Sequence, residues 1–135
     1  TSLAIVGAAI HDVGKLVEVD VVGAKYEQSS TCKSFGWTSN THLYSGLIMF
    51  QTYLANVGYN IPEDDLAILR NIIMSHHGEW CDMKTVTIPA MVVHQADMAS
   101  SQINRMKHGI TRAVDGMVQR DAVGERYMDI DVKRK

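Results

Sequence analysis

The chain has few cysteines and lacks long apolar runs, and each shortage excludes a class of protein. The spacing of its two cysteines, Cys32 and Cys81, fits no zinc-binding pattern. We expect two free thiols in a reducing cytoplasm, although a disulfide between them stays open. No apolar run approaches the roughly 20 residues that span a bilayer, and no segment has the layout of a signal peptide. The sequence therefore predicts a cytoplasmic protein without a membrane partner.

What the sequence does contain is ordinary for one globular domain. Its 135 residues are 46% hydrophobic and 21% charged, which is enough apolar material for a core. The net charge of −2 is uneven, because residues 1–102 carry −5 and residues 103–135 carry +3. The acidic part is suited to a cation-binding site. The basic residues 133–135 are more typical of a solvated terminus than of a phosphate-binding one.

The first expected element is a helix over residues 2–10. These residues are apolar or small on all sides, so the helix is expected to be buried and to end near Gly14. The pair His11-Asp12 would then lie at the deep end of a buried helix. Residues 17–21 alternate like a short strand. The polar segment that continues to residue 40 is typical of a functional loop, for example a lid.

Three further expected helices carry most of the other chemically interesting residues. One begins near residue 40 and places His42 beside an apolar stripe. The next begins in a segment with proline and three acidic residues, and its stripe runs into the doublet His76-His77. The last runs from about residue 90 to 106 and carries Asp97. Together these patterns predict an all-α helical bundle.

Histidines and aspartates recur at the ends and edges of these apolar helices, which indicates a metal site. A mixture of imidazoles and carboxylates binds divalent cations such as Mn, Fe, Ni, Zn, Co or Mg. The donors are enough for one or two ions, which activate water and bind phosphate oxygens. The candidate ligands are His11, Asp12, His42, His76, His77 and Asp97, with Asp12 as the expected bridge.

Each of these residues has an ordinary alternative when taken alone. A His-Asp dipeptide is common, His42 alone would be a half-buried helix histidine, and the doublet would complement a helix dipole. Asp97 is harder to explain in this way, because a carboxylate in an otherwise apolar helix needs a partner. The combination favours the metal site. His94, one turn before Asp97, is expected to orient a ligand or to lie in the core.

These motifs resemble those of the HD superfamily of metal-dependent phosphohydrolases. The stretch from Ala9 to Lys15 is similar to the family's His-Asp motif, and His42 with the following Gly46 to the His-x-x-x-Gly segment of two-metal members. The stretch 76–80 is similar to their His-His doublet, and 94–97 to the segment with the last ligand. The resemblance covers residues 1–107 and is in particular to the HD domain of bacterial 3′-to-5′ exoribonucleases. Cyclic-dinucleotide phosphodiesterases differ, because their Gly-Tyr-Pro sequence is absent after His77.

The resemblance implies an HD-type domain over residues 1–110 and a C-terminal extension over residues 111–135. It implies divalent-metal-dependent hydrolysis of a phosphate ester, with a nucleotide or single-stranded nucleic acid as substrate. Asp12 and Lys15 would be catalytic, and Lys15 would stabilise the phosphoryl transition state. The substrate-binding candidates are Lys15, Trp80, Ser101 and Arg105. For Trp80, stacking on a base competes with ordinary packing. For Arg105, a phosphate contact competes with an ordinary solvated side chain.

One departure from the family pattern keeps a second function open. The family's first histidine lies upstream of the His-Asp pair, and residues 1–10 contain no His, Asp or Glu. One interpretation of this departure is a domain without the family's first helix. The alternative is a catalytically impaired HD domain that acts as a nucleotide- or metal-binding regulatory module. The oligomeric state also stays open, a homo-oligomer included.

Overall fold

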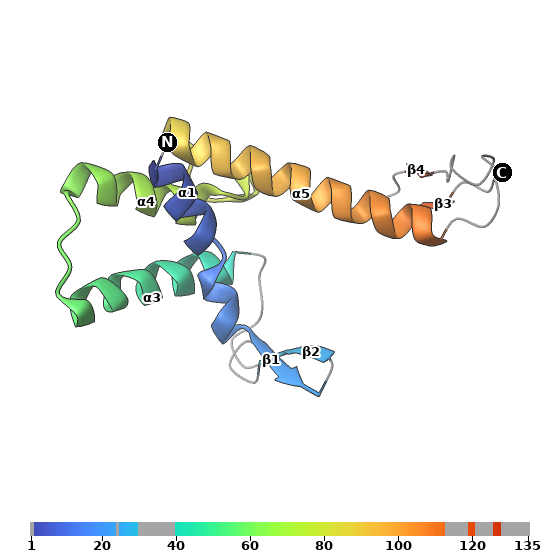
Figure 1. The fold of residues 1–135 in the computed structure, drawn as a ribbon, viewed down its shortest axis with the longest axis horizontal. Helices are drawn as coiled ribbons and strands as arrows, with labels where there is room; N and C mark the ends of the chain where they lie inside the picture. The colour runs from blue at the N-terminus through green and yellow to red at the C-terminus, as the bar shows by residue number, and fades with distance from the viewer. Residues whose placement is uncertain (1, 24, 30–39, 113–118, 121–125, 128–135) are drawn as a thin grey trace. The chain divides into compact units, whose positions relative to one another are not determined.

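The structure is a computed structural model that describes residues 2–23, 25–29, 40–112, 119–120 and 126–127 (Figure 1). The chain forms two compact units, Thr1–Gln95 and Ala96–Lys135. Most of the described residues are helical, and the strands form two small two-stranded sheets. The predicted all-α bundle is therefore confirmed. None of the described helices is both long and apolar enough to cross a membrane.

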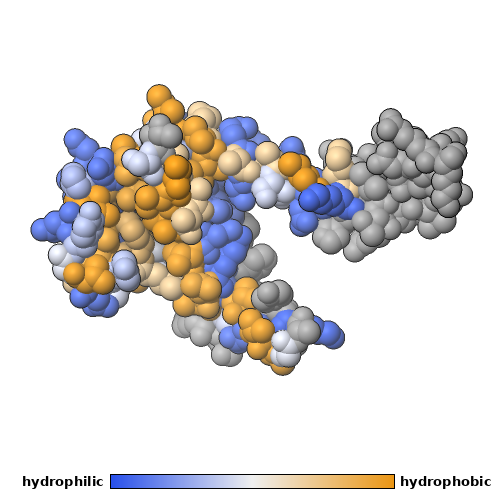
Figure 2. Space-filling model, viewed as in Figure 1, coloured by the Kyte–Doolittle hydropathy of each residue, from blue (hydrophilic) through white to orange (hydrophobic). Residues whose placement is uncertain are grey.

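The first helix, α1 (Ser2–Ile10), has the predicted bounds, but its predicted burial was wrong. Ile5 is 69% exposed and Val6 45% exposed, while Gly7 is buried. A Cβ atom added to Gly7 would lie 2.3 Å from Cδ1 of Ile72, so the small face of α1 rests on α4. Figure 2 shows hydrophobic residues gathered on the face of the first unit where α1 lies. A helix that is apolar all round has no polar side to direct its packing.

The helix α1 ends at Ile10, so Gly14, which we interpreted as a plausible helix end, lies beyond it. Gly14 lies within the short 3-10 helix η1 (Val13–Val17), which packs on α3. A Cβ atom added to Gly14 would lie 1.9 Å from the backbone oxygen of His42 and 2.5 Å from the backbone nitrogen of Gly46. The absent side chain of Gly14 thus lets the two backbones meet, which brings the neighbouring Asp12 up to His42.

The helices α3 (Thr41–Val57) and α4 (Glu63–Ser75) pack against each other, and α1 covers part of α4. As predicted, α3 begins near residue 40. It ends at Val57, and the following Gly58 has a φ of 64°, the left-handed conformation that glycine adopts readily. Pro62 directly precedes α4, and three acidic residues occupy the first turn of this helix.

A core of Leu69, Ile72, Ala90 and Val93 joins α4 to the start of α5 (Ile88–Arg112). These four side chains are between 0% and 2% exposed. The predicted start of the last helix near residue 90 is confirmed, because α5 begins at Ile88 and has Pro89 as its second residue. This core fixes the C-terminal end of α4, where the histidine doublet begins.

The strand predicted over residues 17–21 is present two residues later, as β1 (Val19–Val22). It pairs antiparallel with β2 (Lys25–Gln28), with Val19 opposite Gln28, so part of the predicted loop is a strand. Residues 30–39, the rest of that loop, lie outside the described residues, as does Cys32. Cys81 is a free thiol, as predicted. In the second unit β3 (Gln119–Arg120) pairs antiparallel with β4 (Arg126–Tyr127).

Candidate metal centre

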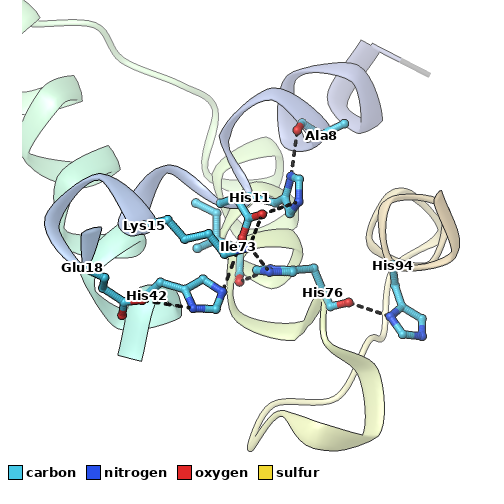
Figure 3. Close-up of polar contacts among 9 residues, drawn as sticks. Ala8, His11, Lys15, Glu18, His42, Ile73, His76 and His94 are labelled. Atoms are coloured by element: carbon cyan, nitrogen blue, oxygen red, sulfur yellow. Dashed lines mark hydrogen bonds and ion pairs between the residues drawn. The ribbon is translucent and has the colours of Figure 1, made fainter. Parts of the chain in front are cut away.

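Five of the six predicted ligands lie together in the first unit. They come from the turn after α1, the first turn of α3 and the end of α4. Two groups of donor atoms within 4.8 Å of one another could each hold a metal ion: His42 with His76 and His77, and His11 with Asp12 and His76. Figure 3 shows His11, His42 and His76 directed toward one another from these three segments. His76 belongs to both groups, so it is the residue that links them.

Two of the imidazoles are oriented by carbonyl groups of their own helices. Nδ1 of His76 donates to the carbonyl of Ile73 at 2.8 Å, and Nδ1 of His11 donates to the carbonyl of Ala8 at 2.8 Å. Because a carbonyl only accepts, Nδ1 carries the proton in both rings and Nε2 is the available donor atom for a metal. Nε2 of His76 lies 3.5 Å from Oδ1 of Asp12, and Nε2 of His11 lies 3.4 Å from Oδ2.

The two oxygens of the Asp12 carboxylate face different residues. Oδ1 lies 3.4 Å from Nε2 of His42, whereas Oδ2 accepts a hydrogen bond from Nζ of Lys15 at 2.6 Å. Burial alone would raise the pKa of Asp12, but contacts with His11, His76 and Lys15 outweigh it and hold the pKa well below its usual value. Asp12 is therefore a carboxylate throughout the physiological pH range, and it faces both groups of donors.

His42 is the second residue of α3 and is 2% exposed. Burial, together with the neighbouring His77, lowers the pKa of His42 to about 4. The imidazole is therefore neutral near pH 7, which is the form that binds metals.

The buried donor atoms fit a divalent cation. Oδ1 of Asp12, Nε2 of His42 and Nε2 of His76 are inaccessible to solvent and have no hydrogen-bond partner within the described part of the chain. Buried polar atoms are nearly always satisfied, since leaving one unsatisfied costs about 1–3 kcal/mol. A cation bound between these three atoms would satisfy all of them at once.

His94 on α5 contacts the backbone of the histidine doublet. Nδ1 of His94 donates to the carbonyl of His76 at 2.6 Å. Gly78, with a φ of 64°, lies against the same ring, since a Cβ atom added there would be 2.5 Å from Cε1 of His94. His94 thus contacts the backbone of a candidate ligand, and its role in orienting that ligand stays a prediction.

A buried amide, Asn71, fastens the segment after the doublet to α4. Its Nδ2 donates to the carbonyl of Lys84 at 2.9 Å, and its Oδ1 accepts from the backbone of Val86 and the hydroxyl of Thr87, both at 3.2 Å. Thr85 adds a bond to the carbonyl of Ser75 at 3.0 Å. These contacts fix the chain on both sides of His76 and His77.

The remaining predicted site residues are placed differently. Asp97, Ser101 and Arg105 belong to the second unit, where they follow one another at four-residue intervals along α5. Their roles as ligand and substrate contacts stay predictions. Trp80, in the 3-10 helix η2 (Gly78–Trp80), is 60% exposed, and its carbonyl accepts a hydrogen bond from Asn40 at 2.9 Å. Its indole is therefore accessible for stacking.

Two features near the centre were missed by sequence reasoning. Glu18 is 3% exposed, with Oε2 3.7 Å from Nδ1 of His42. Its signal was an acidic residue between Val17 and Val19, which we interpreted as strand alternation only.

The second missed feature is a contact between Tyr44 and Asp82. The hydroxyl of Tyr44 donates to Asp82 at 2.9 Å, a contact that raises the pKa of Tyr44. An open pocket of about 450 Å³ adjoins this pair, lined by Leu43, Tyr44, Met74, Asp82, Met83 and Lys84.

Comparison with curated proteins finds distant relatives. The chain is 28% identical over 130 residues to the 3′-5′ exoribonuclease YhaM of Shouchella clausii, covering 93% of this chain and 36% of that protein. It is 27% identical to the Bacillus licheniformis YhaM (82% and 33%) and 25% identical to the Listeria welshimeri YhaM (74% and 30%). The chain thus spans about a third of the length of these relatives. No protein-family model and no solved structure matches it.

Proposed function

We propose that this chain is an HD-type, divalent-metal-dependent phosphohydrolase domain that cleaves a phosphodiester in a nucleotide or a single-stranded nucleic acid. The observation that carries the proposal is the convergence of four imidazoles and one carboxylate from three segments of the first unit. The distant similarity to proteins named 3′-5′ exoribonucleases supports nucleic acid as the substrate class.

In this proposal the six predicted residues, Asp97 included, would hold one or two cations. Asp12 would be the bridging carboxylate. The placement of its two carboxylate oxygens next to different histidines supports the bridging role. A bound divalent cation supplies Lewis acidity, which polarises the phosphoryl group and activates water. In His11 and His76, Nδ1–H donates to a carbonyl, which leaves Nε2 available for binding a cation.

Lys15 is the candidate for stabilising the negative charge of the transition state. Its ammonium group lies next to Oδ2 of Asp12, and its side chain is 51% exposed. A phosphate oxygen that approaches Asp12 from solvent would come next to this ammonium group. The positive charge of Lys15 would then stabilise the negative charge that develops on the phosphate. The exposed indole of Trp80 would stack on a base, and Ser101 and Arg105 would contact the phosphate backbone.

The proposal is tested with the full chain loaded with Mn²⁺ or Ni²⁺ and assayed on bis-p-nitrophenyl phosphate. We expect metal-dependent release of p-nitrophenolate that falls by at least about 100-fold in Asp12→Ala. Asp64→Ala, which removes an exposed carboxylate from the first turn of α4, serves as the control and should keep full activity. Full metal occupancy without turnover by any metal would favour the regulatory module instead.

A second assay addresses the substrate. Single-stranded RNA labelled at its 5′ end should give a ladder of products shortened from the 3′ end, if the chain acts as its distant relatives are named. A mononucleotide phosphodiester cleaved in preference to RNA would place the chain among nucleotide phosphohydrolases.

A further inference from the structure

His42 differs from His11 and His76 in the contact that its Nδ1 makes. His11 and His76 each donate Nδ1–H to the carbonyl three residues earlier. His42 is only the second residue of α3, so α3 itself offers no carbonyl three residues earlier. Its Nδ1 makes no hydrogen bond with any described residue. The orientation of this ring therefore depends on a contact from elsewhere in the chain.

The group that faces Nδ1 of His42 is the carboxylate of Glu18. Oε2 of Glu18 lies 3.7 Å from Nδ1, and both side chains are at most 4% exposed (Figure 3). This separation is longer than a hydrogen bond, and hydrogen bonds at catalytic sites are often long before the ligand is bound and tighten afterwards. On the other side of the ring, the Asp12 carboxylate that faces Nε2 at 3.4 Å shares its charge with Lys15. The Glu18 carboxylate therefore favours the ring tautomer that presents N–H to it.

Glu18 is itself fixed by its backbone. Its N–H donates to the carbonyl of Lys15 at 3.1 Å, and its carbonyl accepts from the N–H of Ser29 at 2.8 Å. The hydroxyl of Ser29 donates to the neighbouring carbonyl of Val17 at 2.9 Å. These bonds tie the backbone of Glu18 both to η1 and to the residue that follows β2. The position of its carboxylate next to His42 is therefore fixed by two elements.

We infer that Glu18 is a positioning residue, which holds His42 as the Nδ1–H tautomer and thereby directs Nε2 at Asp12 and the other candidate ligands. This role rests on the metal binding in the proposed function, because Glu18 can position a ligand only if His42 binds a cation. Glu18 does not touch the substrate or the metal. It acts through the ring, as the carboxylate partners of metal-binding histidines do, whose loss typically weakens metal affinity by about 10- to 100-fold.

The tautomer can be measured in the metal-free wild-type chain. Long-range ¹H–¹⁵N correlation spectra of the full chain with ¹⁵N-labelled histidine, recorded in EDTA at pH 7.5, distinguish the protonated from the unprotonated ring nitrogen. Comparison with His42→Gln assigns the signals of His42. We expect the proton on Nδ1, and a His42 with the proton on Nε2 would overturn the inference. This measurement does not depend on the folding of any Glu18 variant.

Metal affinity provides the second test. Titration calorimetry with Mn²⁺ should show affinity about tenfold weaker in Glu18→Gln than in wild type. The control Asp20→Asn neutralises an exposed carboxylate on β1 and should stay within about twofold. Wild-type affinity in Glu18→Gln, in a chain that hydrolyses phosphodiesters, would overturn the positioning role and leave the proposed function intact. Glu18-dependent Mn²⁺ binding without any hydrolysis would support the positioning role and reject the proposed function.

Discussion

The candidate metal centre has two parts that differ in their contact with solvent. His42 and His76, the inner part, are 2% and 0% exposed. His42 lies on α3, and His76 directly follows α4. His11, Asp12 and Lys15, the rim, have side chains that are 18%, 33% and 51% exposed and lie between α1 and the end of η1. Packing fixes the inner imidazoles, whereas the rim stays open to a substrate. Ligand geometry and substrate access are thus assigned to different elements of the fold.

The largest expected difference concerns metal affinity. His76→Gln should weaken Mn²⁺ binding by more than about 100-fold, because Nε2 of His76 belongs to both groups of donors. His11→Gln removes a donor from the rim and should cost only about tenfold. Titration calorimetry measures both, with circular dichroism as a check on folding. Equal losses in the two variants would contradict the distinction between inner part and rim.

The close approach of η1 to α3 can be broken by one methyl group. Gly14→Ala should lower the free energy of unfolding by about 3 kcal/mol, since the new Cβ meets the backbone of His42, which cannot rotate away. Gly46→Ala on the opposite side of the same contact is the matched control, because its Cβ would lie 3.2 Å from the nearest atom. Urea unfolding should place this control within about 1 kcal/mol of wild type. A loss of stability in Gly14→Ala no larger than the loss in Gly46→Ala would contradict the close approach of η1 to α3.

The inner part should make the metal-free protein sensitive to acid. Because the pKa of His42 falls from 6.5 to about 4 on folding, the unfolded chain takes up a proton before the folded one does. Stability should therefore fall as the pH drops from about 6.5 to 4, by up to about 3 kcal/mol from this group, and change little from it below that range. Urea unfolding in EDTA at several pH values measures the slope. In His42→Gln this part of the slope should disappear, and an unchanged slope would assign the acid sensitivity to other groups.

The smallest effect is expected at the rim. Lys15→Ala should reduce kcat on bis-p-nitrophenyl phosphate by about tenfold through loss of a charge that acts on the transition state. Mn²⁺ affinity should stay within about threefold of wild type, because Lys15 neutralises Asp12 without being a donor. Lys15→Arg should recover part of the loss. A change in affinity with no change in kcat would make Lys15 a structural partner of Asp12 alone.

Much of the fold followed from apolar spacing. The start of α3 after Asn40, its end at Gly58 and the stripe of α4 that leads to His76 were predictable, because a one-sided stripe specifies both the helix and the side that is buried. The burial of α1 was not predictable in this way. With apolar residues on every side, its sequence specifies a helix but not its contacts.

The candidate site was predictable as a set of residue types, and five of the predicted ligands do lie together. The contact between Glu18 and His42 was not, since it joins residues 24 positions apart in different elements. Helical and strand periodicity describe neighbours within one element only. Gly14 was interpreted as a helix end for the same reason, whereas its role is a close approach to another helix.

The central claim is that the convergent histidines and Asp12 bind a divalent cation, and metal content tests it most directly. The full chain is loaded with Mn²⁺, desalted and analysed by emission spectroscopy, with His76→Gln in parallel. The account predicts about one or two equivalents in wild type and a loss of most of this metal in the variant. Less than about a tenth of an equivalent in folded wild-type protein would contradict it.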